Sequence, residues 1–85
     1  MPDPINIVIY SRPGCHLCDD AKAVIEKVRS RYSFILKQIN IESDPALEQA
    51  YGTEIPVITI NGNKAFKYRV DEQEFERKVK RLWNK

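Results

Sequence analysis

The sequence has few of the residues that usually mark a ligand site. Its 85 residues include three glycines, one histidine and two cysteines. No phosphate-binding glycine loop, pair of hydrolase carboxylates or serine triad is evident. A structural zinc site normally takes four ligands, so Cys15, His16 and Cys18, the only soft ligands, cannot complete one within a single chain. Asp19 stands where a haem-attachment motif needs histidine, which excludes that motif.

A long hydrophobic run is also missing. The apolar stretch from Ile5 to Tyr10 is about six residues long, too short for a signal peptide or a membrane span. The amino-terminal segment 1–4 contains no basic residue. We therefore expect a cytoplasmic protein with no membrane partner. In a reducing cytosol, two neighbouring cysteines are more often catalytic or metal-binding than a structural disulfide.

Neither sign of charge is in large excess. The net charge is +2, with 42% apolar and 31% charged residues, which is the balance of one ordinary globular domain over residues 1–85. We expect a monomer. Basic residues gather near the end, but acidic residues precede them in the same predicted helix, as the helix dipole favours. No aromatic residues interleave with them, so we expect a solvated helix face and no nucleic-acid partner. These basic residues are Arg77, Lys78, Lys80, Arg81 and Lys85.

The first half of the chain reads as a strand, a helix and a second strand. Residues 5–10 are rich in isoleucine and valine with little polar alternation, which is typical of a strand covered on both faces. From Cys15 to about Arg31, apolar residues recur at helical spacing. Phe34 to Ile41 forms a second extended run. A helix between two strands makes the strands parallel, with a right-handed crossover.

The second half begins with a short helix and a hairpin. Asp44 supplies an N-cap for a helix that continues to about Tyr51, and Gly52 is expected to end it in a left-handed conformation. Residues 56–60 and 64–68 then read as two strands. The Asn-Gly pair between them tolerates the positive dihedral angles of a tight hairpin turn.

A closing helix follows the hairpin. Asp71 with Glu74 three residues later is an N-terminal capping pattern. Apolar residues at helical spacing predict one buried face, made of Phe75, Val79, Leu82 and Trp83. The whole order predicts an α/β fold with a mixed four-stranded sheet (β-α-β-α-β-β-α) and helices on both faces.

The two cysteines are two residues apart at the start of the first helix, directly after the first strand. Thiols at this spacing can join as a disulfide with little backbone movement, so the pattern indicates dithiol chemistry. The reactive group must be a thiolate, and the helix amino terminus favours one at Cys15. Asp19 and Asp20 oppose this effect by competing for the same donors.

At this point the chain resembles the glutaredoxin-like proteins of the thioredoxin-like superfamily. The resemblance is carried by Tyr10 to Cys18, by the Ile55-Pro56 pair that opens the third strand, and by the order of elements over essentially the whole chain. It implies a thioredoxin-like fold and a thiol–disulfide oxidoreductase that needs no cofactor and works through a mixed-disulfide intermediate.

The resemblance also implies a role for individual residues. Cys15 would be the nucleophile and Cys18 the resolving thiol. Pro56 would be in the cis form and face the cysteines, leaving the backbone of Ile55 free to pair with a bound peptide or glutathione. Arg12 stands where many glutaredoxins have a lysine that attracts the glutathione carboxylate.

Two positions depart from the family pattern. Phe66-Lys67 occupies roughly the place of a Gly-Gly pair that is usual in glutathione-binding glutaredoxins, which counts against glutathione as a partner. His16-Leu17 replaces the Pro-Tyr pair that glutaredoxins commonly have between the cysteines, so the redox potential of glutaredoxins cannot be assigned to this chain. A protein or small-thiol disulfide is the expected substrate.

Two other classes of function remain open. In the first, two copies of the chain share a zinc ion or an iron–sulfur cluster through these cysteines. In the second, the chain is a binding domain that keeps the fold without turnover.

Overall fold

Strands and helices follow one another in the predicted order, with one additional 3-10 turn. A computed structural model describes residues 4–83, so residues 1–3 and 84–85, with Lys85 among them, lie outside the described part. No helix within 4–83 has the length and apolar character needed to cross a membrane. The elements are β1 (Asn6–Ser11), α1 (His16–Arg29), β2 (Ile35–Asn40), η1 (Ile41–Ser43), α2 (Pro45–Tyr51), β3 (Val57–Ile60), β4 (Asn63–Lys67) and α3 (Glu72–Trp83).

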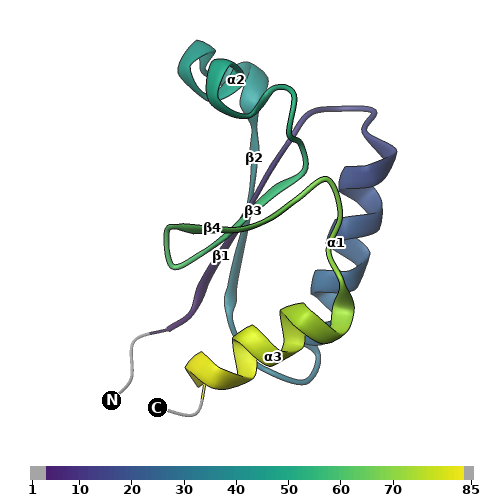
Figure 1. Ribbon diagram of the computed structural model, residues 1–85, viewed down its shortest axis with the longest axis vertical. Helices are drawn as coiled ribbons and strands as arrows, with labels where there is room; N and C mark the ends of the chain where they lie inside the picture. The colour runs from purple at the N-terminus through teal and green to yellow at the C-terminus, as the bar shows by residue number, and fades with distance from the viewer. Residues whose placement is uncertain (1–3, 84–85) are drawn as a thin grey trace.

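The four strands form one mixed sheet in the order β2-β1-β3-β4 (Figure 1). β1 and β2 are parallel, because α1 returns the chain to the starting end of the sheet between them. β3 runs antiparallel to β1, and β4 runs antiparallel to β3. The predicted α/β class and the mixed four-stranded sheet are therefore confirmed.

Helices α1 and α3 cover the same face of the sheet and contact each other there (Figure 1). Side chains of a strand alternate between its two faces, and Ile7 and Ile9 of β1 belong to the buried cluster on this face. Phe75 of α3 joins the cluster, with its ring centroid 5.9 Å from that of Phe34. Burial of these apolar side chains is the main force that holds the helices on the sheet.

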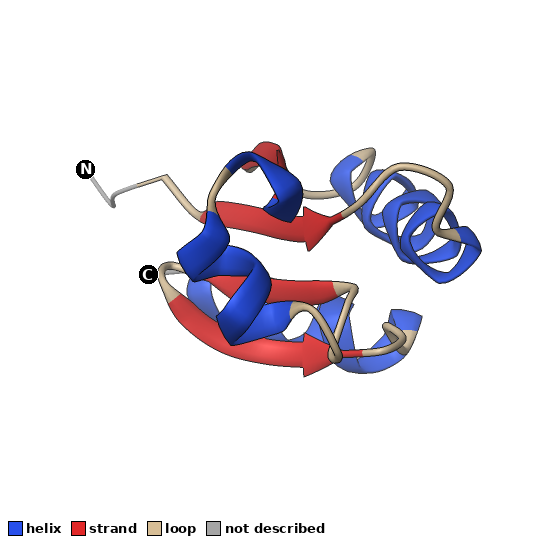
Figure 2. Cartoon of the chain, turned by 90° about the horizontal axis from the view of Figure 1, so that it is seen from above, coloured by secondary structure: helices blue, strands red, loops and turns tan. Residues whose placement is uncertain are grey.

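The opposite face of the sheet meets the short helix α2 near the end of β1. The ring of Tyr10 lies against the ring of Tyr51, with centroids 4.6 Å apart. No residue of α2 is fully buried, so this helix covers only part of the face. Figure 2 shows the strands in red and the helices in blue. Helices therefore lie on both faces, as predicted.

Local signals in the sequence predicted the hairpin turn and the starts of α2 and α3 correctly. Asn61 and Gly62 have φ values of 51° and 85°, which are the positive angles that a tight hairpin turn needs. The Asp44 carboxylate accepts a hydrogen bond from the Ala46 N–H at 2.9 Å. At α3, the Asp71 carboxylate accepts one from the Glu74 N–H at 3.0 Å. Each acid thereby satisfies a backbone donor in the first turn of its helix.

Gly52 was predicted to end α2 in a left-handed conformation, and the predicted conformation was wrong. This residue does end α2, but its φ is −55°, in the right-handed region. A Cβ atom at Gly52 would lie 2.5 Å from the backbone oxygen of Glu48. Glycine is therefore required by the close approach of the backbone and not by a left-handed conformation.

The prediction that Trp83 lies in the core was also wrong. Its side chain is 46% exposed, whereas Phe75 and Val79 of the same helix are fully buried. Trp83 is the last residue of α3, and its ring and that of Tyr32 meet edge to face, with centroids 5.5 Å apart. The apolar spacing therefore continues to the end of the helix, but the burial of its side chains does not.

Candidate functional site

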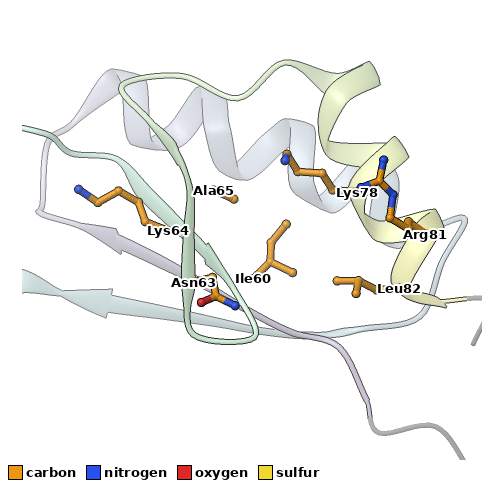
Figure 3. Close-up of a pocket in the computed structure, with 7 residues that line it drawn as sticks. All are labelled: Ile60, Asn63, Lys64, Ala65, Lys78, Arg81 and Leu82. Carbon is orange, nitrogen blue, oxygen red and sulfur yellow. The ribbon is translucent and has the colours of Figure 1, made fainter.

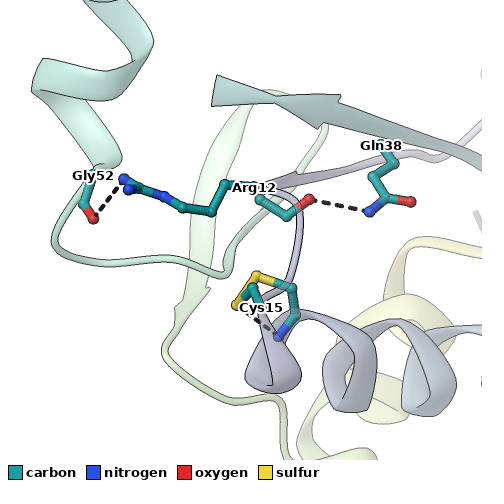
Figure 4. Close-up of a disulfide and its surroundings, with 6 residues drawn as sticks. Arg12, Cys15, Gln38 and Gly52 are labelled. Atoms are coloured by element: carbon teal, nitrogen blue, oxygen red, sulfur yellow. Dashed lines mark hydrogen bonds between the residues drawn. A yellow bond between two sulfur atoms is a disulfide. The ribbon is translucent and has the colours of Figure 1, made fainter. Parts of the chain in front are cut away.

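Cys15 and Cys18 form a disulfide at the start of α1, and their Cα atoms are 5.2 Å apart (Figure 4). This separation lies inside the usual range for disulfides. Cys15 is the N-cap of α1, so the helix begins one residue later than predicted, at His16. The Cys18 N–H donates a hydrogen bond to Cys15 Sγ, with the nitrogen 3.1 Å from the sulfur. The pair therefore has the geometry that a switch between dithiol and disulfide requires.

The two sulfur-bearing residues differ in exposure. Cys18 is buried, with 2% of its surface exposed, and it packs on the inner side of α1. Cys15 is only half-buried. An incoming disulfide can therefore reach Cys15 from solvent, while Cys18 is accessible mainly to its neighbour in the same turn.

The loop before the cysteines turns sharply into the helix. Gly14 has a φ of 77°, a left-handed angle that an L-residue with a side chain rarely adopts. This turn places Cys15 at the helix start, where backbone N–H groups have no helical acceptor and carry partial positive charge. Asp19 also lies in the first turn, as the sequence indicated.

A polar pocket of about 320 Å³ lies beside the buried cysteine. Its polar lining includes Ser11 at the end of β1 and Gln38 and Asn40 from β2, which is the neighbouring parallel strand. Gln38 Nε2 donates a hydrogen bond to Ser11 Oγ at 3.1 Å (Figure 4). These three residues were not among the predicted site residues. Their only signal was their place at the carboxyl ends of strands predicted to be parallel, where α/β folds usually bind ligands.

Pro56 follows a cis peptide bond from Ile55, as predicted. Pro56 directly precedes Val57, the register partner of Tyr10 in β1. The proline therefore lies at the edge of the sheet from which the cysteine loop leaves. Pro56 is buried and Ile55 is half-buried.

The segment that contains Ile55 is attached to β4 and to the residue that follows it. Lys64 Nζ of β4 lies 2.6 Å from Glu54 Oε1. This hydrogen bond lowers the pKa of Glu54 and raises the pKa of Lys64. The Tyr68 N–H donates to the backbone oxygens of Pro56 and Glu54, at 3.0 and 3.3 Å. These contacts hold the backbone of Ile55 in place.

Arg12 already has protein partners. Its Nη2 donates to the backbone oxygen of Gly52 at 3.2 Å (Figure 4) and lies 3.3 Å from Glu48 Oε1. Arg12 thus joins the cysteine loop to the end of α2. These partners could not be predicted from the sequence, because they lie far from Arg12 along the chain.

The part of the chain that the structure describes holds no cluster of three or more histidine, cysteine, aspartate or glutamate side chains arranged to bind a metal. Cys15 and Cys18 are joined to each other by the disulfide. Their arrangement supports exchange of a disulfide between the pair and an external thiol.

Comparisons with known proteins agree with this arrangement. The family model described as Glutaredoxin-like domain (DUF836) matches residues 6–80. The glutaredoxin-like protein YDR286C homolog of Dictyostelium discoideum is 34% identical over an alignment of 74 residues, and the match covers 80% of this chain and 68% of that protein.

Solved structures show the same fold. Protein Ne2328 from Nitrosomonas europaea superposes with a TM-score of 0.80 at 26% identity, covering 93% of this chain and 95% of that one. A thioredoxin variant from Halobacterium salinarum NRC-1 superposes with a TM-score of 0.69 at 17% identity, covering 98% of this chain and 78% of that one. The latter likeness concerns the fold alone. The fold is thioredoxin-like, and the chain belongs to the glutaredoxin-like family.

Proposed function

We propose that this protein is a thiol–disulfide oxidoreductase, with Cys15 as the nucleophile and Cys18 as the resolving thiol. The observation that carries the proposal is the difference in exposure within one disulfide: Cys15 is half-buried, and Cys18 is 2% exposed. A substrate sulfur must meet the accessible residue first. The shielded residue then acts on the bond that forms.

The reaction has two exchange steps. In the first, the Cys15 thiolate attacks one sulfur of a substrate disulfide, the substrate S–S bond breaks, and one substrate thiolate leaves. In the second, Cys18, having lost its proton, attacks Cys15 Sγ and releases the other substrate thiolate, which takes up a proton. The substrate disulfide gains two electrons, and the protein is left with the Cys15–Cys18 disulfide. A thiol reductant in the cell returns the pair to the dithiol.

The substrate in this proposal is a disulfide-containing protein or a small-thiol disulfide. The backbone of Ile55, held beside cis Pro56, would pair with an extended substrate next to Cys15. Arg12 would attract a substrate carboxylate in competition with Glu48. Phe66-Lys67 in place of a Gly-Gly pair counts against glutathione. The proposal places the protein in the cytosol as a monomer, where the surrounding thiols are reduced.

Single-cysteine variants test the proposal. Cys15→Ser should abolish reduction of a model protein disulfide, such as that of insulin, because no accessible nucleophile remains. Cys18→Ser should retain the first step and accumulate a mixed disulfide, detectable by mass spectrometry as an adduct at Cys15. A mixed disulfide trapped by Cys15→Ser but not by Cys18→Ser would reverse the two roles. If both variants reduced the model disulfide as fast as the unmodified protein, that result would contradict the proposed function.

The electron donor is tested in the same assay. Because Phe66-Lys67 replaces the Gly-Gly pair, turnover driven by glutathione with glutathione reductase should be slower than turnover driven by thioredoxin reductase with NADPH. Faster turnover with glutathione would overturn this part of the proposal and leave the dithiol chemistry in place.

A further inference from the structure

A second pocket lies far from the cysteines, between the β3–β4 hairpin and α3 (Figure 3). It has a volume of about 230 Å³. Ile60, which lines it, pairs with Ile7 near the start of β1, whereas the cysteines follow the end of that strand. The pocket is therefore at the opposite end of the sheet from the dithiol, and the proposed redox function does not use it.

The pocket combines an apolar floor with a cationic rim. The floor is formed by Ile60, Ala65 and Leu82. Lys78 and Arg81 contribute to the rim from α3, one turn apart. Figure 3 shows the side chain of Lys78 extending from the helix toward the hairpin, with Arg81 beside it. None of the described residues that line the pocket carries a carboxylate.

Among the described residues, no acidic side chain compensates the charges of Lys78 and Arg81. Within residues 4–83, no carboxylate oxygen lies within 4 Å of either group. The acidic first turns of α3 interact with α1 instead: Glu72 lies 3.4 Å from Lys27, and Glu76 pairs with Arg31. The remaining cation of the lining, Lys64, is bound to Glu54 and points away from the pocket (Figure 3).

An edge strand runs along the pocket. β4 is the last strand of the sheet and pairs only with β3 among the described strands. Its register with β3 shifts, because Ile58 faces Phe66 and Thr59 faces Lys64. Ala65 is therefore an extra residue of a β-bulge, a feature that increases local twist and re-aims side chains. The free backbone groups of an edge strand can accept another extended segment.

We propose that this pocket binds an extended polypeptide segment in which an aliphatic residue and an acidic residue stand two positions apart. Residues i and i+2 of an extended chain point to the same side. The aliphatic side chain would then lie on the floor, and the carboxylate would meet Lys78 and Arg81 in charge-assisted hydrogen bonds. The segment's backbone would pair with β4. The partner is thus a protein with an exposed acidic strand.

Titration of the full-length, isotope-labelled protein followed by NMR tests this proposal. The probe is the peptide acetyl-Thr-Leu-Thr-Glu-Thr-amide, and its matched control carries Gln in place of Glu. The Glu peptide should shift the amide signals of residues 60–65 and 78–82, and the Gln peptide should bind much more weakly. Equal binding of the two peptides would overturn the role of the charges. Tighter binding of free hexanoate than of the peptide would overturn the assignment to a polypeptide.

Two double variants that each remove two positive charges from α3 distinguish binding at this pocket from non-specific electrostatic attraction of the peptide to the helix. Lys78→Ala with Arg81→Ala should weaken binding of the Glu peptide by at least about tenfold, because two charge-assisted hydrogen bonds are lost. Arg77→Ala with Lys80→Ala removes the same charge from the same helix and should leave binding nearly unchanged. An equal loss in both pairs would show non-specific attraction and contradict the proposal. Disulfide exchange should be unaffected by substitution of any of these four residues, so this test does not depend on the dithiol chemistry.

Discussion

The backbone N–H of Cys18 lies 3.1 Å from Cys15 Sγ and donates a hydrogen bond to it. In the reduced protein, the same donor and the helix amino terminus favour a negative charge on this sulfur. We expect the pKa of the Cys15 thiol to lie below ~8.5, the value of free cysteine. The rate of alkylation of the Cys18→Ser variant as a function of pH measures it. A midpoint at or above that of free cysteine would contradict this account of activation.

In the proposed function, the ion pair between Arg12 and Glu48 would compete with an anionic substrate for the guanidinium. Glu48→Gln leaves the guanidinium bonded to the backbone of Gly52 but removes the carboxylate that lies 3.3 Å from it. We expect the KM for a negatively charged small disulfide, such as oxidised glutathione, to fall by about threefold, as suits an exposed ion pair. The KM for neutral hydroxyethyl disulfide is the control and should not change. An equal change for both substrates would refute a charge effect at Arg12.

Phe75 is the central side chain of the core. It is fully buried, and its ring centroid lies 5.9 Å from that of Phe34 and 6.1 Å from that of Phe66. Phe75→Ala should lower the free energy of unfolding by about 3–5 kcal/mol, because it removes buried apolar surface and leaves a cavity. Trp83→Ala is the comparison, since Trp83 is 46% exposed. Similar losses in denaturant unfolding of the two variants would be inconsistent with the observed core.

The Glu54–Lys64 pair predicts a change of stability with pH. The hydrogen bond from Lys64 lowers the pKa of Glu54 below its usual 4.5. A carboxyl whose pKa is lower in the folded state stabilises the protein above its unfolded pKa, and the contribution is lost as the pH falls through the folded pKa. Glu54→Gln should therefore flatten the decline of Tm below about pH 4.5. Lys64→Met should flatten it in the same way; an unchanged acid profile in both would rule out this pair as a source of pH dependence.

Much of the fold could be predicted because its signals are local. The Asn61-Gly62 turn, the caps Asp44 and Asp71, and the cysteine pair at a helix start each depend on a few adjacent residues. The Gly52 conformation could not be predicted in this way, because the crowding that requires glycine comes from a backbone oxygen one turn earlier in the folded helix.

The rest of the candidate site depends on contacts between distant parts of the chain. Arg12 meets Gly52 only after α2 folds back toward the cysteine loop, and Gln38 meets Ser11 across two parallel strands. Trp83 continues the apolar spacing of α3 and is nevertheless 46% exposed at the end of the helix. Periodicity identifies the apolar side of a helix, but it does not give the length over which that side is covered.

The central claim is that Cys15 and Cys18 pass reversibly between dithiol and disulfide in the native protein. Equilibration in glutathione or dithiothreitol redox buffers, followed by acid quenching, alkylation and mass spectrometry, tests it most directly. We predict a single two-electron transition in which both cysteines change together while the fold is retained. Cysteines that stay reduced in every oxidising buffer, or that are held in a zinc or iron–sulfur centre, would contradict the account.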